Sequence, residues 1–243
     1  MTGPPAGTGV MRVGVTLPQF CDEAGRALAA ARRAEELGLD GVFCFDHLWP
    51  LGQPDRPALS SSPLLGAVAA STTTIALGSL VARIGLLPDD VLVSVITSLS
   101  AISRRRFIAG LGTGDNLSRA ENLAFGLPFE RADERRARMA SVAATVRRES
   151  VPVWIGGGVP KTVEVARQVG AAVNLWEGEL AQVAELTAAG LEVTWGGPLD
   201  GTVHELAEQL GELAAAGATW TVCAWPESLD AVAEAAAAAR ASF

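Results

Sequence analysis

The sequence predicts an α/β fold, and within that class a closed (βα)8 TIM barrel formed by a single domain. Short apolar runs alternate with Ala-rich amphipathic segments from residue 11 onward, which is typical of a parallel sheet covered by helices. Eight such pairs fit into 243 residues, near the roughly 250 typical of these barrels. The segment after the first strand, LPQFCDEAGR, has no Gly-x-Gly-x-x-Gly turn, which disfavours an open dinucleotide-binding sheet.

The first half of the chain supplies four strands, each followed by a helix. The opening strand, MRVGVTLP, precedes an Ala-rich helix whose last residue, Gly38, suits a left-handed helix end. The third helix begins with Pro88 and two aspartates, as helix amino ends favour. The expected strands are 11–18, 40–46, 74–82 and 105–112, and the expected helices are 23–38, 63–72, 88–103 and, after a longer connection, 131–148.

The second half repeats the same alternation more regularly. Its strands are rich in Val, Ile, Leu and Trp, as expected when helices cover a parallel sheet. The expected strands are 151–157, 171–177, 191–197 and 218–226, and the expected helices are 160–170, 179–190, 202–217 and 228–243. Residues 1–10, MTGPPAGTGV, lack the basic start and apolar core of a leader and are expected to be a disordered tail. The barrel domain is expected over 11–243.

Composition excludes several classes of function. Hydrophobic residues make up 49% of the chain, enough for a large core, and the net charge of −8 argues against nucleic acid or an anionic membrane as a partner. No apolar run reaches membrane-spanning length. Cys21, Cys44 and Cys223 are odd in number and far apart, so reduced thiols in a cytoplasmic protein are expected. With two histidines, and His204 on a helix face, no metal site is expected.

Candidate site residues follow from the carboxyl ends of the strands, where such barrels keep their chemistry. The second strand ends in Asp46 and His47, followed by Trp49. Two glycine-rich ends, GLGTGDN and GGGVPK, follow the fourth and fifth strands, and the latter opens a helix near Pro160 beside Lys161. Either glycine run alone is equally explained by a tight turn. Together, on adjacent strands, they favour a phosphate-bearing ligand.

Four tryptophans also fall near strand ends. A rim of indoles can stack on a planar cofactor, or it can fill the top of the barrel as core, and both interpretations stay open for each residue. These four are Trp49, Trp176, Trp195 and Trp225, whereas Trp154 lies in the middle of a strand and is expected in the core.

Several segments resemble the luciferase-like monooxygenase superfamily, in particular its branch that uses the deazaflavin coenzyme F420. The resemblance covers essentially residues 11–243. It is carried by AEELGLDGVFCFDHLW, by TTTIALGSLVARIGLLPDDVLVSVITSLSAISRRRFIAGLGTGD, by AENLAFGLPFERADERRARM and by VPVWIGGGVPKTVEVARQVGAAVNLW.

The resemblance implies roles for individual residues. It places His47 near the reactive ring carbon as a proton donor or orienting group, with Asp46 beside it to tune its basicity and Trp49 flanking the substrate. Leu80 and Val81 fall where the family often has a non-prolyl cis peptide bulge behind the ring. The ribityl chain or ring edge would be lined by Gly112, Thr113, Gly114, Asp115 and Ser118, and the phosphate would be bound by the strand-five glycines, Gly156, Gly157 and Gly158, mainly through the amides of the last two.

The implied function is an F420-dependent oxidoreductase that moves a hydride between the deazaflavin and a small organic substrate. Two alternatives stay open: an FMN-dependent monooxygenase or reductase, and a non-catalytic or degenerate flavin-binding member. Ala171-Ala172 stands where the family often has Asp-Gly, and the connections after strands four and seven are short. We therefore expect trimmed loops at the carboxyl face and an open pocket. The resemblance also implies a homodimer.

Overall fold

The chain folds into one closed barrel of eight parallel strands, as the alternating pattern predicts. A computed structural model describes residues 10–241, so the expected tail at 1–10 lies almost wholly outside the described residues. Each strand pairs with its neighbours in the chain, and the last pairs with the first. The strands are β1 (Arg12–Thr16), β2 (Gly41–Cys44), β3 (Ala76–Arg83), β4 (Phe107–Gly112), β5 (Val153–Gly156), β6 (Ala172–Trp176), β7 (Val193–Gly197) and β8 (Ala218–Cys223).

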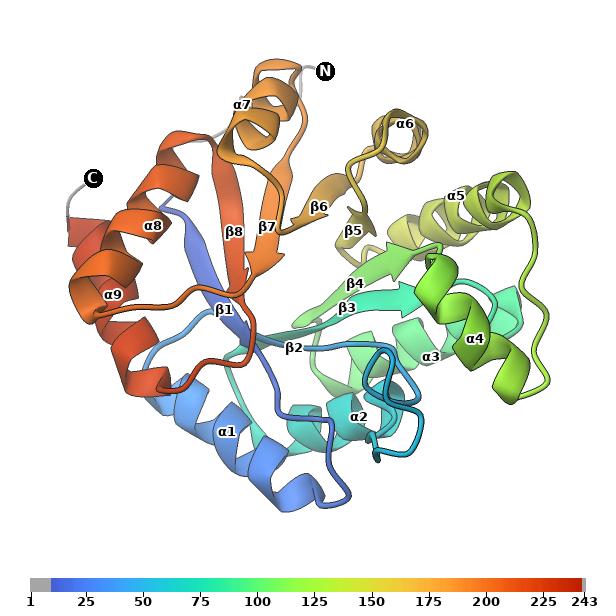
Figure 1. Ribbon diagram of the computed structural model, residues 1–243, viewed down its shortest axis with the longest axis horizontal. Coiled ribbons are helices and arrows are strands. Elements are labelled where there is room, and N and C mark those ends of the chain that lie inside the picture. The colour runs from blue at the N-terminus through green and yellow to red at the C-terminus, as the bar shows by residue number, and fades with distance from the viewer. Residues whose placement is uncertain (1–9, 242–243) are drawn as a thin grey trace.

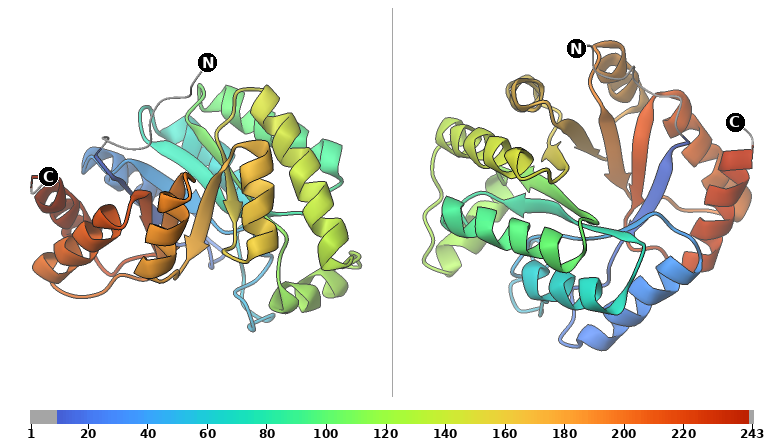
Figure 2. Two further views of the ribbon diagram at one scale, coloured as in Figure 1. Left: turned by 90° about the horizontal axis from the view of Figure 1, so that it is seen from above. Right: turned by 180° about the vertical axis from the view of Figure 1, so that it is seen from behind.

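Helices form the outer layer and follow one another around the barrel in chain order, as Figure 1 shows and Figure 2 shows from behind. Residues 10–241 hold nine helices, one more than the sequence predicts. They are α1 (Ala24–Glu36), α2 (Ser61–Ser71), α3 (Asp89–Ile102), α4 (Asn116–Ala124), α5 (Ala132–Arg148), α6 (Pro160–Val169), α7 (Leu180–Ala188), α8 (Val203–Ala215) and α9 (Leu229–Ala241). The additional helix is α4.

Helix α4 occupies the connection after β4, where the sequence predicts no helix. Asp115 caps the helix, because its Oδ1 accepts hydrogen bonds from the backbone N of Ser118 at 2.9 Å and from the Ser118 hydroxyl at 3.0 Å. The buried face of α4 is polar, whereas Leu117 and Leu123 are 62% and 56% exposed. In most helices of a barrel the apolar residues face the strands, whereas in α4 the polar residues are buried and the leucines face outward. The connection from β7 to α8 is short, as expected.

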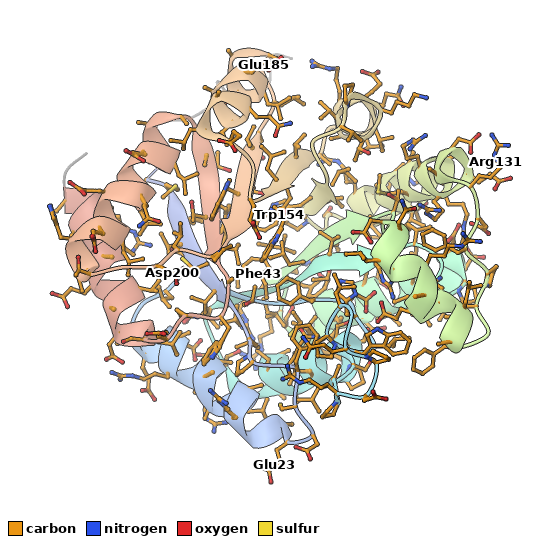
Figure 3. The ribbon with its side chains drawn as sticks, viewed as in Figure 1. Glu23, Phe43, Arg131, Trp154, Glu185 and Asp200 are labelled. Atoms are coloured by element: carbon orange, nitrogen blue, oxygen red, sulfur yellow. The ribbon has the colours of Figure 1, made fainter. Side chains whose placement is uncertain are left out.

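Aromatic side chains fill the interior of the barrel. The Phe43 ring stacks on Trp154 with centroids 5.1 Å apart and meets Trp220 edge-on at 5.8 Å. Figure 3 shows Phe43 and Trp154 within the ring of strands, with Arg131 and Glu185 at the periphery. A Cβ at Gly78 would lie 2.8 Å from the Phe43 ring, so the glycine makes room for it. Trp154 is 3% exposed, which confirms its expected place in the core.

Contacts between α9 and α1 close the outer layer. Arg33 of α1 pairs with Asp230 of α9 at 2.5 Å. Asp40, just before β2, accepts from the backbone N of Val13 at 2.7 Å and pairs with Arg240 near the end of α9. The last helix is thus tied to the first strand–helix unit.

The three cysteines are free thiols, and Cys44 and Cys223 are buried. Burial raises the pKa of the Cys223 thiol to about 12. Among residues 10–241 no group of three or more His, Cys, Asp or Glu side chains is arranged to hold a metal ion. Within the same range, none of the helices combines the length and the apolar character that crossing a bilayer requires.

Candidate functional site

A cavity of about 620 Å³ opens at the carboxyl ends of the strands. Its size falls within the range of small-molecule and cofactor sites. Ten of the thirteen site residues expected from the sequence line it: His47, Leu80, Val81, Thr113, Gly114, Asp115, Ser118, Gly156, Gly157 and Gly158. Asp46, Trp49 and Gly112 are not part of the lining.

The back of the cavity is formed by an irregular end of β3. The peptide bond between Leu80 and Val81 is cis, as the resemblance implies, and the register with β4 shifts between Ser79 and Ala82. The Ser79 hydroxyl donates to the carbonyl oxygen of Gly110 at 2.8 Å and supports the bulge from the neighbouring strand. A Cβ at Gly156 would lie 3.0 Å from Val81, so that glycine leaves room for the Val81 side chain.

His47 is held by a carboxylate from a distant part of the chain. Its Nδ1 lies 3.0 Å from Oε2 of Glu121 on α4, and the same oxygen lies 2.8 Å from Nη2 of Arg83. The other Glu121 oxygen accepts from the backbone N of Leu48. With Nδ1 engaged by a carboxylate, Nδ1 carries a proton and Nε2 is the nitrogen left for the cavity.

Glu121 remains ionised because of this arrangement. Its side chain is fully buried, and burial by itself would raise its pKa. The hydrogen bonds with His47 and with the Leu48 amide, together with the positive charge of Arg83, outweigh burial and hold the pKa below its ordinary value. Arg83 is itself 4% exposed, so this is a buried ion pair at the edge of the cavity.

Asp46 does not pair with His47, contrary to the expectation from the sequence. Its Oδ1 accepts from the Ser61 hydroxyl at 2.7 Å, and its Oδ2 accepts from the backbone N of Arg83 at 2.9 Å. Successive side chains of an extended segment point to opposite sides, so Asp46 faces α2 while His47 faces the cavity. Asp46 therefore fixes the end of β3 in place.

Asp115 supplies a second carboxylate to the cavity. Burial would raise its pKa, but hydrogen bonds from Ser118 and the amide of Leu117, with the nearby His47, keep it lowered. The preceding loop is held from behind, because Nε of Arg135 donates to the carbonyl oxygen of Thr113 at 2.7 Å. The end of β4 thus presents an ionised carboxylate on a fixed loop.

The glycine run after β5 forms a close-packed corner. Gly157 has φ +117°, a conformation that favours glycine, and its N donates to the carbonyl oxygen of Asn174 at 2.9 Å. A Cβ at Gly158 would lie 2.5 Å from the Gln182 side chain. Helix α6 begins at Pro160, as expected, but Lys161 does not line the cavity.

Aromatic rings form one wall of the cavity. Phe20 stacks on Phe45 with centroids 5.9 Å apart, and Phe45 meets Trp176 edge-on at 5.2 Å. Of the four tryptophans near strand ends, Trp176 alone lines the cavity. Trp49 packs on Phe125 of the α4 end instead.

Two more indoles are held away from the cavity. The Trp195 indole N–H donates to the carbonyl oxygen of Gly178 at 2.8 Å, and the Trp225 ring lies under Arg26. Of the two interpretations left open for the four tryptophans, the cavity rim therefore holds for Trp176 alone, and the wall consists of one indole with two phenyl rings.

Sequence reasoning missed Glu121 and Arg83 as functional residues. Glu121 lies within the quoted segment AENLAFG, and Arg83 ends the third strand, so both stood in segments that already pointed to the site. The sequence analysis did not predict helix α4, which carries Glu121. Without that helix there is no reason to bring Glu121, 74 residues further along the chain, back to His47.

Comparison with known proteins agrees with this geometry. The family model described as luciferase-like monooxygenase matches residues 8–148, more than half of the chain. A curated relative named F420-dependent glucose-6-phosphate dehydrogenase, from Beutenbergia cavernae, is 32% identical over 130 residues. That match covers 53% of this chain and 37% of the relative. A protein of the same name from Nakamurella multipartita is 36% identical over 108 residues, a match that covers 44% of this chain and 31% of the relative. The matched segments thus span about a third of these relatives.

Solved structures share the fold at low sequence identity. An F420-dependent secondary alcohol dehydrogenase in complex with an F420-acetone adduct superposes with a TM-score of 0.80 at 13% identity, covering 95% of this chain and 99% of that one. The coenzyme F420 dependent tetrahydromethanopterin reductase from Methanopyrus kandleri superposes with a TM-score of 0.74 at 14% sequence identity. The match covers 97% of this chain and 100% of that one. The family match, its location over the first five helices and the barrel architecture lead to one conclusion: the chain belongs to the luciferase-like monooxygenase family.

Proposed function

We propose that this protein is an F420-dependent oxidoreductase that transfers a hydride between the deazaflavin and a small organic substrate. The observation that carries the proposal is the meeting of His47, the Leu80–Val81 bulge and the glycine run in one cavity. The names of the curated relatives and of the solved structures with the same fold support F420 as the cofactor.

The residues of the cavity fit the two chemically distinct parts of such a coenzyme. A planar ring needs apolar faces, which the cis bulge and the wall of Phe45 and Trp176 offer. A phosphate needs a close approach to backbone amides, and Gly158 and the start of α6 lie at the cavity where they would offer it, whereas the Gly157 amide already donates to the carbonyl oxygen of Asn174. Thr113, Gly114 and Ser118 lie between these two regions along the chain and would hold the connecting polyol.

The bound deazaflavin would supply two-electron hydride chemistry, and the protein would then bind, orient and exclude water. His47 is the group suited to hold or move the substrate proton. Because Glu121 engages Nδ1, the free Nε2 is presented to the cavity in a fixed orientation. Asp115 contributes a negative charge on the opposite loop, where it would orient a polar group of the substrate or cofactor.

Cofactor binding tests the proposal directly. The purified full chain would be titrated separately with F420 and with FMN, following the fluorescence of each chromophore. We expect saturable binding of F420 and much weaker binding of FMN. Tight binding of FMN alone would move the protein to the flavin-dependent alternative, and binding of neither would support the degenerate alternative and contradict the proposal.

We also propose a homodimer and a cytoplasmic location, as the resemblance and the free thiols suggest. The exposed apolar side chains of α4, namely Leu117 and Leu123, with Phe125 just beyond it, support the dimer because such surface is usually covered. Light scattering of the wild type and of a Leu123→Ser, Phe125→Ser variant tests this. A wild-type protein that is monomeric at micromolar concentration would contradict the dimer.

A further inference from the structure

A second cavity, of about 300 Å³, lies at the opposite end of the barrel, where the strands begin. Its apolar floor is made by Ile108, Trp154 and Trp220, which also belong to the aromatic core inside the barrel. That core separates this cavity from the candidate active site. Nothing in the proposed function uses it.

Four arginines from three parts of the chain line this second cavity. Arg12 lies at the start of β1, Arg105 and Arg106 lie in the turn between α3 and β4, and Arg147 lies in the last turn of α5. Glu192 is the one carboxylate among the lining residues. The local excess of positive charge is opposite in sign to the net charge of −8 of the whole chain.

One of these arginines is already committed to the fold. The guanidinium of Arg106 donates to the carbonyl oxygens of Ala69, Thr72 and Ile75. These acceptors are neutral, and the carboxylate that acts on the Arg106 charge is Glu35, which is itself bound to the backbone of 73–75.

The other three guanidinium groups have no anionic partner. Arg12 lies over the Trp220 ring, 5.4 Å from its centroid, and makes no ion pair with any residue in 10–241. Arg105 and Arg147 also make no ion pair with any residue in 10–241. Glu192 forms no ion pair with these three arginines among residues 10–241, and its Oε1 accepts from the Thr219 hydroxyl at 3.1 Å. Three guanidinium forks are therefore free to bind an anion.

The backbone of the α3–β4 turn sets the position of Arg105. Arg105 has φ +66° and the preceding Arg104 has φ +54°, in the left-handed region that glycine or asparagine adopts with less strain. An arginine at this position sacrifices some local stability and places its long side chain at the cavity. The Arg104 N donates to the carbonyl oxygen of Ala101 and the Arg105 N to that of Ser100, so this conformation closes the end of α3.

We infer that this cavity binds a small polyvalent oxyanion, with a phosphate ester as the chemical class. Guanidinium forks pair with phosphate oxygens through two parallel hydrogen bonds, and several unpaired forks favour a ligand with more than one negative charge. The apolar floor beneath them suits a ligand whose body is less polar than its anionic group. This site is separate from the phosphate corner at Gly157 and Gly158.

A competing explanation is that the arginines only stabilise helix ends. In this barrel α3 and α5 end at the same face, and positive charge near a helix carboxyl end is favourable. That explanation predicts a loss of stability on substitution but no anion binding. The affinity of the cavity for an anion therefore distinguishes the two explanations.

The experiment follows the indole NMR resonances of the full-length protein during titration with pyrophosphate, inorganic phosphate and citrate. Trp220 reports on the arginine cavity and Trp176 on the active-site cavity, so binding at the two ends is distinguished. Arg105→Gln with Arg147→Gln is the test variant. Arg104→Gln with Arg148→Gln is the matched control, because those neighbours are equally exposed and their substitution removes the same charge, but they do not line the cavity.

We expect saturable shifts of the Trp220 resonance with pyrophosphate, and a dissociation constant raised at least about tenfold in the test variant, as for the loss of charge-assisted hydrogen bonds. The control variant should bind as the wild type does. A flat Trp220 titration in a folded wild-type protein would overturn the inference. So would equal weakening in both variants, which would indicate non-specific attraction. Shifts with citrate but with neither phosphate probe would overturn the phosphate class.

Discussion

His47 and His204, the two histidines of the chain, have opposite surroundings. The His47 side chain is 17% exposed and bound to buried Glu121, whereas His204 is 83% exposed and lies 3.4 Å from Glu208 on the surface of α8. If His47 holds or moves the substrate proton, His47→Ala should lower kcat with F420 roughly a hundredfold or more, the usual contribution of a positioned proton-transfer group. Steady-state kinetics of the purified variant would measure this.

The matched control is His204→Ala, which should leave kcat and the melting temperature unchanged. Folding of His47→Ala should also be intact, because Glu121 keeps Arg83 and the Leu48 amide as partners. A variant that retains wild-type turnover would assign His47 a structural role only.

Glu121 tests the energetics of the same cluster. Glu121→Gln removes the carboxylate that pairs directly with the buried guanidinium of Arg83 and leaves the more distant charges of Asp46 and Asp115, and breaking a buried pair typically costs about 3–5 kcal/mol. Urea denaturation at pH 7 would measure the free energy of unfolding. The control is Glu130→Gln, which breaks a pair with Arg138 at the more exposed edge and should cost about 1 kcal/mol or less.

The pH dependence of that difference has a defined sign. The folded-state pKa of Glu121 is lowered, so its stabilising contribution is present above the ordinary carboxyl pKa and is lost as the pH falls through the folded value. The stability gap between wild type and Glu121→Gln should therefore narrow on acidification. A gap that widens in acid would contradict the lowered pKa.

Sequence reasoning located His47 but chose the wrong partner for it. The position of His47 follows from counting strands, since the residues that follow β2 lie at the carboxyl end of the barrel. Its partner depends on a long-range contact, which local sequence does not encode. Adjacency in the chain suggested Asp46, and the alternation of side chains along an extended segment turns that carboxylate away.

Glu35 links two elements, because it lies in the last turn of α1 and caps the start of β3. Its Oε1 accepts from the backbone N atoms of Thr73 at 2.8 Å, Thr74 at 2.6 Å and Ile75 at 3.0 Å. Burial would raise its pKa, but these hydrogen bonds outweigh it and lower the value to about 2. Glu35 thus stabilises the fold above about pH 4.5, and this contribution is lost as the pH falls towards 2.

Glu35→Gln should therefore lower the free energy of unfolding at pH 7 by about 1–2 kcal/mol, after allowance for solvent screening. Denaturant titrations at neutral and acidic pH would show the deficit shrinking in acid. Glu36→Gln provides the comparison, since that exposed residue only pairs with Arg33 at 3.4 Å and should change stability little. Equal effects of the two substitutions would contradict the capping role.

At the scale of elements, the regular helices were predictable and α4 was not. Helices such as α8 carry an apolar face towards the strands, and the same periodicity that buries Leu206, Leu210 and Leu213 identifies the helix. Helix α4 buries Glu121 instead and exposes leucines, so its pattern does not match a helix packed on a barrel. The Leu80–Val81 bulge was expected through resemblance, since nothing in its composition specifies a cis bond.

For the whole molecule, the count of eight strand–helix units predicted a closed barrel, and closure follows from simple pairing of neighbours. The contacts that complete it could not be predicted, because Asp40 and Arg240 are 200 residues apart. Such closure makes both ends of the barrel depend on one another for stability. A ligand bound only at the carboxyl face is therefore expected to stabilise the entire fold.

This coupling yields a prediction about the intact protein. At a concentration one hundred times its dissociation constant, a ligand adds about 2.7 kcal/mol to the free energy of unfolding. For a domain of this size that corresponds to a rise in Tm of about 5–10 °C. Differential scanning calorimetry should show this rise with F420 and a much smaller one with an equal concentration of FMN.

The phosphate corner can be tested in the same measurement. A Cβ at Gly158 would lie 2.5 Å from Nε2 of Gln182 and 2.8 Å from Leu175, so Gly158→Ala should displace these two lining side chains, distort the corner and largely abolish the rise with F420. Gly66→Ala on α2 is the control, because nothing lies within 4 Å of its Cβ position. That variant should retain the full rise and gain about 0.4–1 kcal/mol of stability itself. An undiminished rise in Gly158→Ala would show that the coenzyme phosphate binds elsewhere.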